Sequence, residues 1–288
     1  MPTRVNINGT IVAPDQAMIS VFDHGFLFGD SVYEAFRTYR GKPFLFTRHH
    51  DRLEISARGI YLDLPWKLER MRSEVLRTID AANNPGDSKV RLIVTRGAGD
   101  VNASPETCAD PRVIIIVEPL PEFPVKMYSE GVKMTVSSVT RGGMVAAYKT
   151  GNLMHQVLAS REARDRGAYD AILLTADGFM SDGISCNIYM VQGSIIKTPG
   201  SEAAIIEGIT KAAVVLIARD LGLDLRQGLF KPEEIHRSDE MFFTSSYREV
   251  VPVVRVDGKP IGNGKPGLWT TKILAAYHEA VEKLIAED

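Results

Sequence analysis

Short hydrophobic runs alternate with polar stretches along the chain, and their spacing predicts a mixture of strands and helices. Residues 4–7 and 10–12 flank an Asn8-Gly9 dipeptide, a strong β-hairpin signal because both positions tolerate positive φ. Residues 32–39 include apolar residues such as Val32 and Phe36 among polar ones, as expected of a strand.

The next stretch predicts a turn, a returning strand and two helices. Gly41-Lys42-Pro43 turns the chain, and Phe44-Leu45-Phe46 is expected to return as a strand. Thr47 is the expected N-cap of a helix that runs to about Ile60. A second helix is predicted from residue 65 or 66 to about 82, with one apolar face made of Leu68, Met71, Val75, Leu76 and Ile79.

A cluster of prolines divides the chain. Pro119, Pro121 and Pro124 stiffen the backbone and remove hydrogen-bond donors. We therefore expect a smaller N-terminal α/β domain over 1–118, a linker over 119–124 and a larger domain over 125–288. Further strands are predicted at 89–95, 112–117, 131–138, 169–175, 186–192, 240–244 and 250–256, and further helices near 150–166, 209–221 and 267–286.

Composition limits the class of protein without naming a function. The 288 residues are 44% hydrophobic and 24% charged, close to globular averages. Thirty-four basic and thirty-six acidic residues give a net charge of -2, which argues against nucleic acid or an anionic membrane as partner. No apolar run approaches the ~20 residues of a membrane helix. Two cysteines without a CxxC pair make a reducing, cytoplasmic location the default expectation.

Several familiar motifs are better explained as ordinary structure. Gly262–Gly267 matches GxGxxG, but too few residues follow it to form a βαβ unit, so we expect a surface turn. His49 and His50 are adjacent on a predicted helix and would point about 100° apart, so no metal site is expected. The absence of GxSxG and HExxH removes support for two hydrolase classes.

Four polar segments could carry chemistry, although each is also compatible with an ordinary surface role. Lys149 follows an apolar stretch at the entry to a helix, where desolvation favours the free amine that a Schiff base needs. Arg52 could recognise phosphate with its fork. The helix start at Glu207–Thr210 and the turn at Thr244–Tyr247 both offer N–H groups to an anion.

Taken in chain order, six segments resemble the motifs of the class IV aminotransferases, the fold-type IV pyridoxal-phosphate family. That family includes branched-chain aminotransferases, D-amino acid aminotransferases and aminodeoxychorismate lyase. The resemblance covers nearly the whole chain. The segments are His24–Glu34, His49–Leu53 (the HxxRL phosphate motif), Lys149–Asn152 with its following helix, Gly178–Asn187, Gly208–Thr210 (the GITR phosphate motif) and Thr244–Val253.

The resemblance implies a role for each matching residue toward pyridoxal 5'-phosphate. Lys149 would form the Schiff base and act as the catalytic base. The phosphate would be held by Arg52, the Ile209 N–H, Thr210, Ser245 and Ser246. Asp182 falls where the family usually has glutamate opposite the pyridine nitrogen. Aspartate keeps the negative charge but is one methylene shorter, so the ring must sit closer or a water must bridge.

The substrate pocket matches no subgroup cleanly. Arg37, three residues after Glu34, is typical of branched-chain enzymes, and Arg91 falls near their arginine for the distal carboxylate of glutamate. Lys89, however, replaces their usual tyrosine. The RxH pair of many D-amino acid enzymes is missing from residues 97–102. Arg248 could bind a carboxylate or face solvent, and the expected substrate-binding residues are Tyr33, Arg37, Arg91 and Tyr247.

The resemblance implies a two-domain α+β homodimer with the cofactor in the interdomain cleft. The reaction would be transamination between an amino acid or amine and a 2-oxo acid, most like that of a branched-chain enzyme. The alternatives are a D-amino acid or R-amine aminotransferase, and an aminodeoxychorismate-lyase-like enzyme. A non-catalytic homologue is favoured only by the shortened acid at Asp182.

Overall fold

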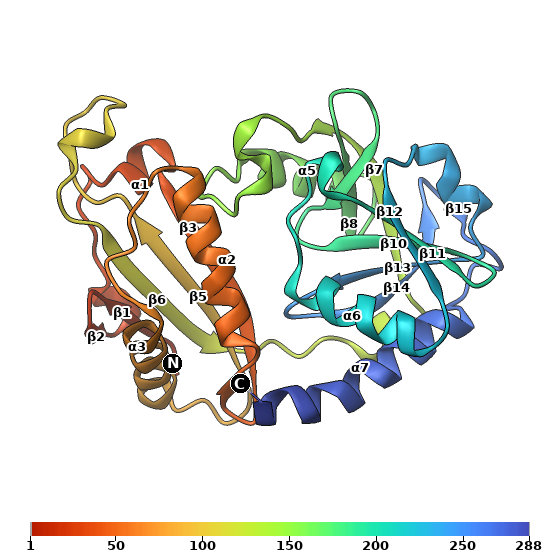
Figure 1. Cartoon of the computed structure of the whole chain (residues 1–288), viewed down its shortest axis with the longest axis horizontal. Coiled ribbons are helices and arrows are strands. Elements are labelled where there is room, and N and C mark those ends of the chain that lie inside the picture. The colour runs from red at the N-terminus through yellow and green to blue at the C-terminus, as the bar shows by residue number, and fades with distance from the viewer. Residues whose placement is uncertain (1, 288) are drawn as a thin grey trace. The chain divides into compact units, whose positions relative to one another are not determined.

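The computed structural model describes residues 2–287, and their contacts form two compact units (Figure 1). The first unit runs to Pro121 and also takes in Tyr148–Leu153 and the chain from Leu284. The second contains Glu122–Ala147 and Met154–Lys283. The change from one unit to the other at Pro121 falls inside the proline cluster. The segment with Lys149 groups with the first unit, whereas the predicted boundaries assigned it to the larger domain.

The first unit is built on a six-stranded antiparallel sheet in the order β2-β1-β6-β5-β3-β4. The predicted hairpin is confirmed, because Val5 pairs with Val12 across the Asn8-Gly9 turn. The strands are β1 (Arg4–Ile7), β2 (Thr10–Val12), β3 (Ser31–Tyr39), β4 (Lys42–Pro43), β5 (Ser88–Thr95) and β6 (Arg112–Pro119).

Helices α2 (Phe46–Gly59) and α3 (Leu68–Ala82) bury their apolar faces in one core with this sheet; a short helix, α1 (His24–Phe28), precedes β3. On α3, Met71, Val75 and Ile79 recur every fourth residue and are buried, as a helical stripe requires. Leu76 was expected on the same face, but it is 39% exposed. It follows Val75 directly and is therefore rotated about 100° away from the core.

The predicted return strand at 44–46 and the predicted N-cap at Thr47 are both wrong. The returning strand is only Lys42–Pro43, and α2 begins at Phe46 with Leu45 as its N-cap in a left-handed conformation, φ 51°. Phe44, Leu45 and Phe46 are all buried, so core packing decides their conformation. The Thr47 hydroxyl accepts a hydrogen bond from Arg72 of α3 instead of capping its own helix.

The second unit contains a nine-stranded mixed sheet in the order β12-β11-β10-β13-β14-β7-β8-β9, with β15 added to β14. β7 runs parallel to both β14 and β8, and β11 is parallel to β12. The strands are β7 (Val132–Thr140), β8 (Asp170–Leu174), β9 (Met180–Gly183), β10 (Asn187–Gln192), β11 (Ile195–Pro199), β12 (Asp224–Gly228), β13 (Glu240–Ser245), β14 (Glu249–Val256) and β15 (Lys259–Pro260).

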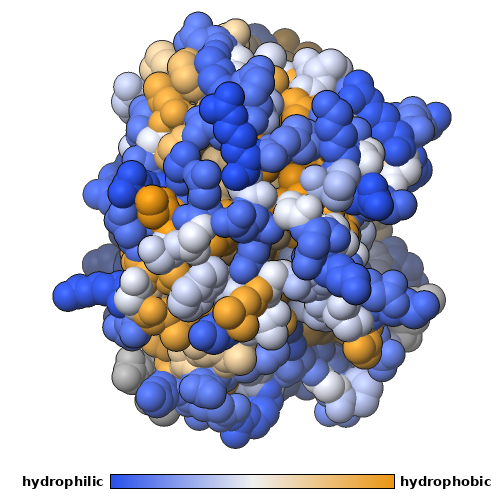
Figure 2. Space-filling model, turned by 90° about the vertical axis from the view of Figure 1, so that its right-hand side faces the viewer, coloured by the Kyte–Doolittle hydropathy of each residue, from blue (hydrophilic) through white to orange (hydrophobic). Residues whose placement is uncertain are grey.

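The helices of the second half lie close to the predicted positions. They are α5 (Met154–Asp165), α6 (Ile209–Asp220) and α7 (Leu268–Glu287), with a short additional α4 (Val125–Ser129). The helix expected from about residue 150 begins only at Met154, because Thr150 forms a β-bridge with Val32. One face of the molecule carries mostly hydrophilic side chains with scattered apolar ones (Figure 2). Within residues 2–287, no helix is long and apolar enough to cross a membrane.

Candidate active site

Lys149 is held along the free edge of β3. Tyr33 donates its backbone N–H to the Lys149 carbonyl at 2.9 Å, and Gly151 donates to Ser31 at 2.8 Å. From the other side, the Lys149 N–H donates to the hydroxyl of Ser56 on α2 at 3.1 Å. A Cβ on Gly151 would lie 2.2 Å from Ser31 Oγ, so only glycine allows this close approach. The backbone around Lys149 is therefore fixed by two elements.

The side chain of Lys149 lies beside Tyr33, and Arg91 lies over the ring of the same tyrosine; both were predicted to bind substrate. Lys149 Nζ is 3.4 Å from Tyr33 Oη, and the Arg91 guanidinium lies 4.1 Å from the centre of the Tyr33 ring. Burial alone would raise the pKa of Tyr33, but Lys149 and Arg91 more than offset this and lower it. A phenol whose pKa is lowered in this way, within hydrogen-bond distance of a primary amine, suits a site for proton transfer.

The opposite face of β3 carries a buried carboxylate, Glu34, between two side chains of α2. Arg52 donates to it through Nε at 2.7 Å and through Nη2 at 2.6 Å, and His49 Nδ1 lies 2.6 Å away. Burial would raise the pKa of Glu34, but Arg52 and His49 hold it well below its usual range. Burial also lowers the pKa of His49. The ionised pair is thus Glu34 with Arg52, and neutral His49 orients it.

Arg52, the predicted phosphate ligand, is therefore anchored before any ligand binds. Its Nε and Nη2 donate to Glu34. These two hydrogen bonds fix the plane of the guanidinium. The sequence motif included Glu34 without a role; a lone acidic residue inside an apolar strand could have indicated a buried ion pair.

Asp182 lies at the end of β9 in the second unit and is 4% exposed. It accepts hydrogen bonds from Asn187 Nδ2 and from the Ile206 N–H, both at 2.8 Å. Arg141 Nη1 is 4.0 Å from its carboxylate. Burial raises the pKa of Asp182 in spite of these three neighbours. The carboxylate is under-compensated, so a further N–H donor or cation would be stabilised beside it.

Sequence reasoning missed Arg141, which follows β7. Its side chain is buried, Nη2 donates to the Ala146 carbonyl at 2.8 Å, and Nε is buried without a hydrogen-bond partner among the described residues. Arg141 thus has a buried N–H without an acceptor, and Asp182 has too few donors around it. A polar ring bound against Asp182 would suit such a place. A protonated pyridine nitrogen has the donor chemistry that this carboxylate lacks.

The start of α6 and the turn after β13 supply hydroxyl and N–H donors in the same unit. Gly208 is the N-cap of α6 and provides no side-chain cap, so the first-turn N–H groups of the helix remain for other acceptors. A Cβ on Gly208 would lie 1.9 Å from Asn187 Oδ1. Ile209 and Thr210 are buried, and Ser245 and Ser246 are half-buried. This donor set fits a phosphate.

The other two predicted substrate residues, Arg37 and Tyr247, belong to different units. Arg37 pairs with Asp87 at 3.2 Å and lies over the ring of Tyr39, 4.2 Å from its centre. Tyr247 lies in the turn between β13 and β14, in the second unit. Their roles toward substrate stay predictions.

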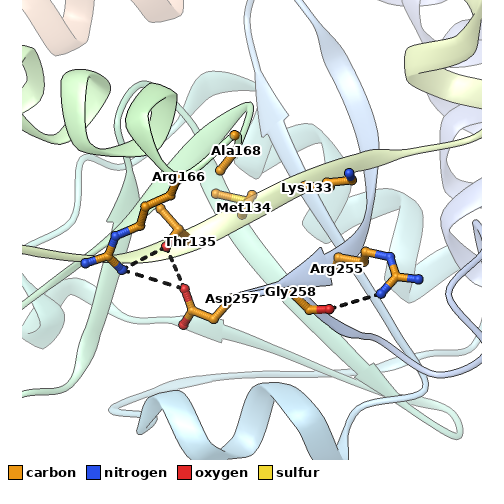
Figure 3. A pocket seen from close by; sticks show the side chains of 9 residues that line it. Lys133, Met134, Thr135, Arg166, Ala168, Arg255, Asp257 and Gly258 are labelled. Carbon is orange, nitrogen blue, oxygen red and sulfur yellow. Dashed lines mark hydrogen bonds and ion pairs between the residues drawn. The ribbon is translucent and has the colours of Figure 1, made fainter.

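A separate hollow of about 770 Å³ opens on the second unit (Figure 3). Arg166 and Asp257 lie on one side of it, and Lys133 and Arg255 on the other. Arg166 donates to Thr135 Oγ1 at 3.1 Å. Its lining contains no predicted site residue.

Comparison with known proteins identifies the family. The model of the family described as amino-transferase class IV matches residues 31–256. The chain is 35% identical to the "Putative branched-chain-amino-acid aminotransferase" of Methanocaldococcus jannaschii over 279 residues, 96% of each protein. It is 28% identical to aminodeoxychorismate lyase of Bacillus subtilis (98% of this chain, 96% of the relative) and 30% identical to D-alanine aminotransferase of Bacillus licheniformis (96% and 97%).

The fold is shared with solved aminotransferases. The branched-chain amino acid aminotransferase of Escherichia coli superposes with a TM-score of 0.89 at 26% identity, covering 96% of this chain and 93% of that one. A second branched-chain amino acid aminotransferase, solved with pyridoxamine 5'-phosphate, superposes with a TM-score of 0.91 at the same identity and coverage. The chain belongs to the class IV aminotransferases. The predicted α+β fold of that class is thereby confirmed.

The buried cluster around Glu34 predicts that acid destabilises the protein. The pKa values of Glu34 and His49 are lower in the folded chain than their ordinary values of 4.5 and 6.5. The unfolded chain therefore binds more protons, and the free energy of unfolding falls as the pH drops below about 6.5, and further below 4.5. At pH 7, Glu34→Gln should cost about 3–5 kcal/mol, because it leaves Arg52 unpaired.

Urea denaturation at a series of pH values measures this. The difference in free energy of unfolding between wild type and Glu34→Gln should narrow by about 1.4 kcal/mol per pH unit below 4.5, because Glu34 takes up a proton in the unfolded wild-type chain but not in the folded one. Glu118→Gln, which removes an exposed ion pair with Lys89, is the matched control. A gap that stays constant down to about pH 3.5 contradicts the buried pair.

Proposed function

We propose that the protein is a pyridoxal-phosphate-dependent aminotransferase that moves the amino group of a branched-chain amino acid to a 2-oxo acid. The observation that carries this proposal is the Lys149 amine, whose backbone is fixed and which contacts Tyr33, the phenol that Arg91 also contacts. A primary amine beside a phenol suits both covalent attachment of a carbonyl and proton transfer.

Each unit offers groups whose chemistry suits a part of this cofactor. Arg52, the N–H of Ile209, Thr210, Ser245 and Ser246 would hold its phosphate. Asp182 would accept from the ring nitrogen, and Lys149 would carry it covalently. When bound, pyridoxal phosphate supplies an electron sink for the electrons released at the substrate Cα.

The chain's own groups then manage charge and protons. Once the amino donor has displaced it, the free Lys149 Nζ would accept the proton from Cα of the donor as a base and would give it up again as an acid. Asp182 would favour a protonated ring nitrogen, because a nearby carboxylate raises the pKa of such a nitrogen. Tyr33 and Arg91 orient the substrate carboxylates. The two half-reactions predict ping-pong kinetics.

The branched-chain donor is favoured by similar proteins and by Arg91. The relative at 35% identity and the structure with a TM-score of 0.91 both carry that name. D-alanine transamination and aminodeoxychorismate lyase activity are the alternatives, supported by relatives at 30% and 28% identity. Release of pyruvate from aminodeoxychorismate without an oxo-acid acceptor would separate the lyase from the aminotransferase.

We also propose a homodimer, supported by apolar side chains on the first unit. Met18, Val21, Phe22 and Phe26 lie within nine residues and are 52–77% exposed, a pattern typical of a surface covered by another chain. Phe26→Asp should convert a dimer into a monomer in sedimentation experiments, because a buried charge is costly. Val125→Asp, at an equally exposed site of the second unit, is the control. A wild-type monomer would rule out this proposal.

Loss of the Lys149 amine should abolish turnover and leave the fold intact. Borohydride reduction of the wild-type holoenzyme should attach the cofactor to the peptide containing Lys149, as peptide mass spectrometry can show, and Lys149→Ala should give no adduct. Lys211 is the internal control, since it is buried and paired with Glu207 at 3.2 Å. A label on Lys211 or on any other lysine would disprove the assignment.

Asp182→Asn should slow proton transfer by roughly 10²-fold or more, the range for losing one preorganised electrostatic partner. The amide is nearly isosteric but uncharged. Asp182→Glu should also lose activity, because Asn187 and Ile206 already contact the shorter acid. The measurement is the single-turnover rate of the first half-reaction. The control is Asp177→Asn, which changes an exposed residue on the neighbouring loop. A wild-type rate in Asp182→Asn would show that Asp182 does not face the ring nitrogen.

A further inference from the structure

Arg248 follows the predicted phosphate turn, and it neither faces solvent nor is left open for a substrate carboxylate. Its side chain is 12% exposed. Each of its three guanidinium nitrogens donates within the second unit: Nη1 to Asp170 Oδ2 at 3.1 Å, Nη2 to Ser185 Oγ at 2.8 Å, and Nε to Ser245 Oγ at 3.1 Å. The guanidinium also lies 4.7 Å from the centre of the Phe243 ring.

Asp170 holds Arg248 as a buried cation. Burial by itself would lower the pKa of Arg248, but the Asp170 carboxylate more than offsets this and raises it. The other oxygen of Asp170 accepts from the N–H groups of Ala171 at 2.8 Å and Ile184 at 2.9 Å. Both charges are therefore paired and hydrogen-bonded, which a buried ion pair needs in order to persist.

The guanidinium joins two turns that carry different parts of the proposed cofactor site. Ser185 lies between β9 and β10, beside Asp182 and Asn187. Ser245 ends β13 and is followed by Ser246. Arg248 thus connects the segment with the ring-nitrogen acid to the segment with the phosphate hydroxyls. Arginine suits this task because its fork is planar and its donors have fixed directions.

The same contacts set the hydrogen-bond role of Ser245. Its Oγ accepts from the Arg248 N–H at 3.2 Å and from Arg248 Nε at 3.1 Å. A hydroxyl has two lone pairs and one proton, so two accepted bonds leave it only as a donor. A phosphate oxygen only accepts hydrogen bonds. Arg248 therefore leaves the Ser245 hydroxyl with only its proton to offer, and a phosphate oxygen requires such a donor.

We propose that Arg248 is a positioning residue for the cofactor phosphate: it orients the Ser245 hydroxyl as a donor and ties the phosphate turn to the Asp182 segment. This rests on the proposed function, since it assumes that the phosphate of pyridoxal phosphate binds at this turn. It also excludes Arg248 from substrate recognition, so the donor's carboxylate is bound elsewhere.

The test compares Arg248→Met with Arg248→Lys and with the control Arg226→Met, which removes an exposed pair with Asp224 at 2.7 Å. Two properties are measured on each purified holoenzyme: the dissociation constant of pyridoxal phosphate, by absorbance titration, and the ³¹P chemical shift of its bound phosphate. The KM of the amino donor is measured separately at saturating cofactor.

Arg248→Met should weaken cofactor binding about tenfold or more, the expected effect of losing charge-assisted contacts, and should shift the ³¹P signal. Arg248→Lys should lie between it and wild type, because an ammonium keeps the charge near Asp170 but cannot span both serines. KM for the amino donor should change less than about threefold. Arg226→Met should match wild type in all three measurements.

A raised KM with unchanged cofactor affinity and ³¹P shift would overturn the proposal and make Arg248 a substrate ligand. If Arg248→Met does not fold, Ser245→Ala decides, because it removes only the hydroxyl: weaker cofactor binding supports the proposal, and wild-type binding overturns it. A wild-type protein that binds no pyridoxal phosphate would instead overturn the proposed function itself.

Discussion

Burial of carboxylates is the constraint on which the arrangement of this protein's predicted site depends. Glu34, Asp170 and Asp182 are each less than 5% exposed, and an ionised carboxylate is costly at such places unless cations or N–H groups surround it. Each one therefore fixes its neighbours. Glu34 orients Arg52 through two hydrogen bonds, and Asp170 holds Arg248. Two of these acids thus position the arginines Arg52 and Arg248.

The same physics gives opposite outcomes at Glu34 and Asp182. Arg52 lies 2.6 Å from Glu34, whereas Arg141 lies 4.0 Å from Asp182. Direct contact overcomes the cost of burial in the first case and lowers the pKa; in the second, burial prevails and the pKa rises. A saturated ion pair suits a structural anchor, and an under-compensated acid suits a place where a bound group completes the hydrogen bonding. Two carboxylates whose surroundings shift their pKa values in opposite directions are typical of functional sites.

The parts of the fold with a local cause could be predicted from the sequence. The Asn8-Gly9 hairpin and the buried stripe of α3 follow from turn chemistry and helical spacing. The start of α2 could not be predicted, because core packing of Phe44 and Phe46 places Leu45 in a left-handed conformation and overrides the cap signal at Thr47.

Prediction of the candidate site from the sequence has the same limit. Lys149, Arg52 and Asp182 are predicted site residues only through their resemblance to family motifs, since each is an ordinary residue by itself. The resemblance gave no role to Arg141 and left that of Arg248 open. The partners of Arg248 are distant in the chain, Asp170 being 78 residues away, so only the folded structure brings them together. Ordered motifs thus identify the chemistry, and tertiary contacts identify the residues that support it.

The central claim, transamination of a branched-chain donor, is tested most directly by the first half-reaction with single amino acids. Purified holoenzyme would be mixed with L-valine, L-leucine, L-isoleucine or D-alanine, and the absorbance of the bound cofactor and the 2-oxo acid formed would be measured. We expect each of the three L-amino acids to change the absorbance and to give about one equivalent of oxo acid per site, as one half of a ping-pong cycle requires. We expect D-alanine to do neither. An unchanged absorbance with every L-amino acid, or conversion of D-alanine alone, would contradict the central claim.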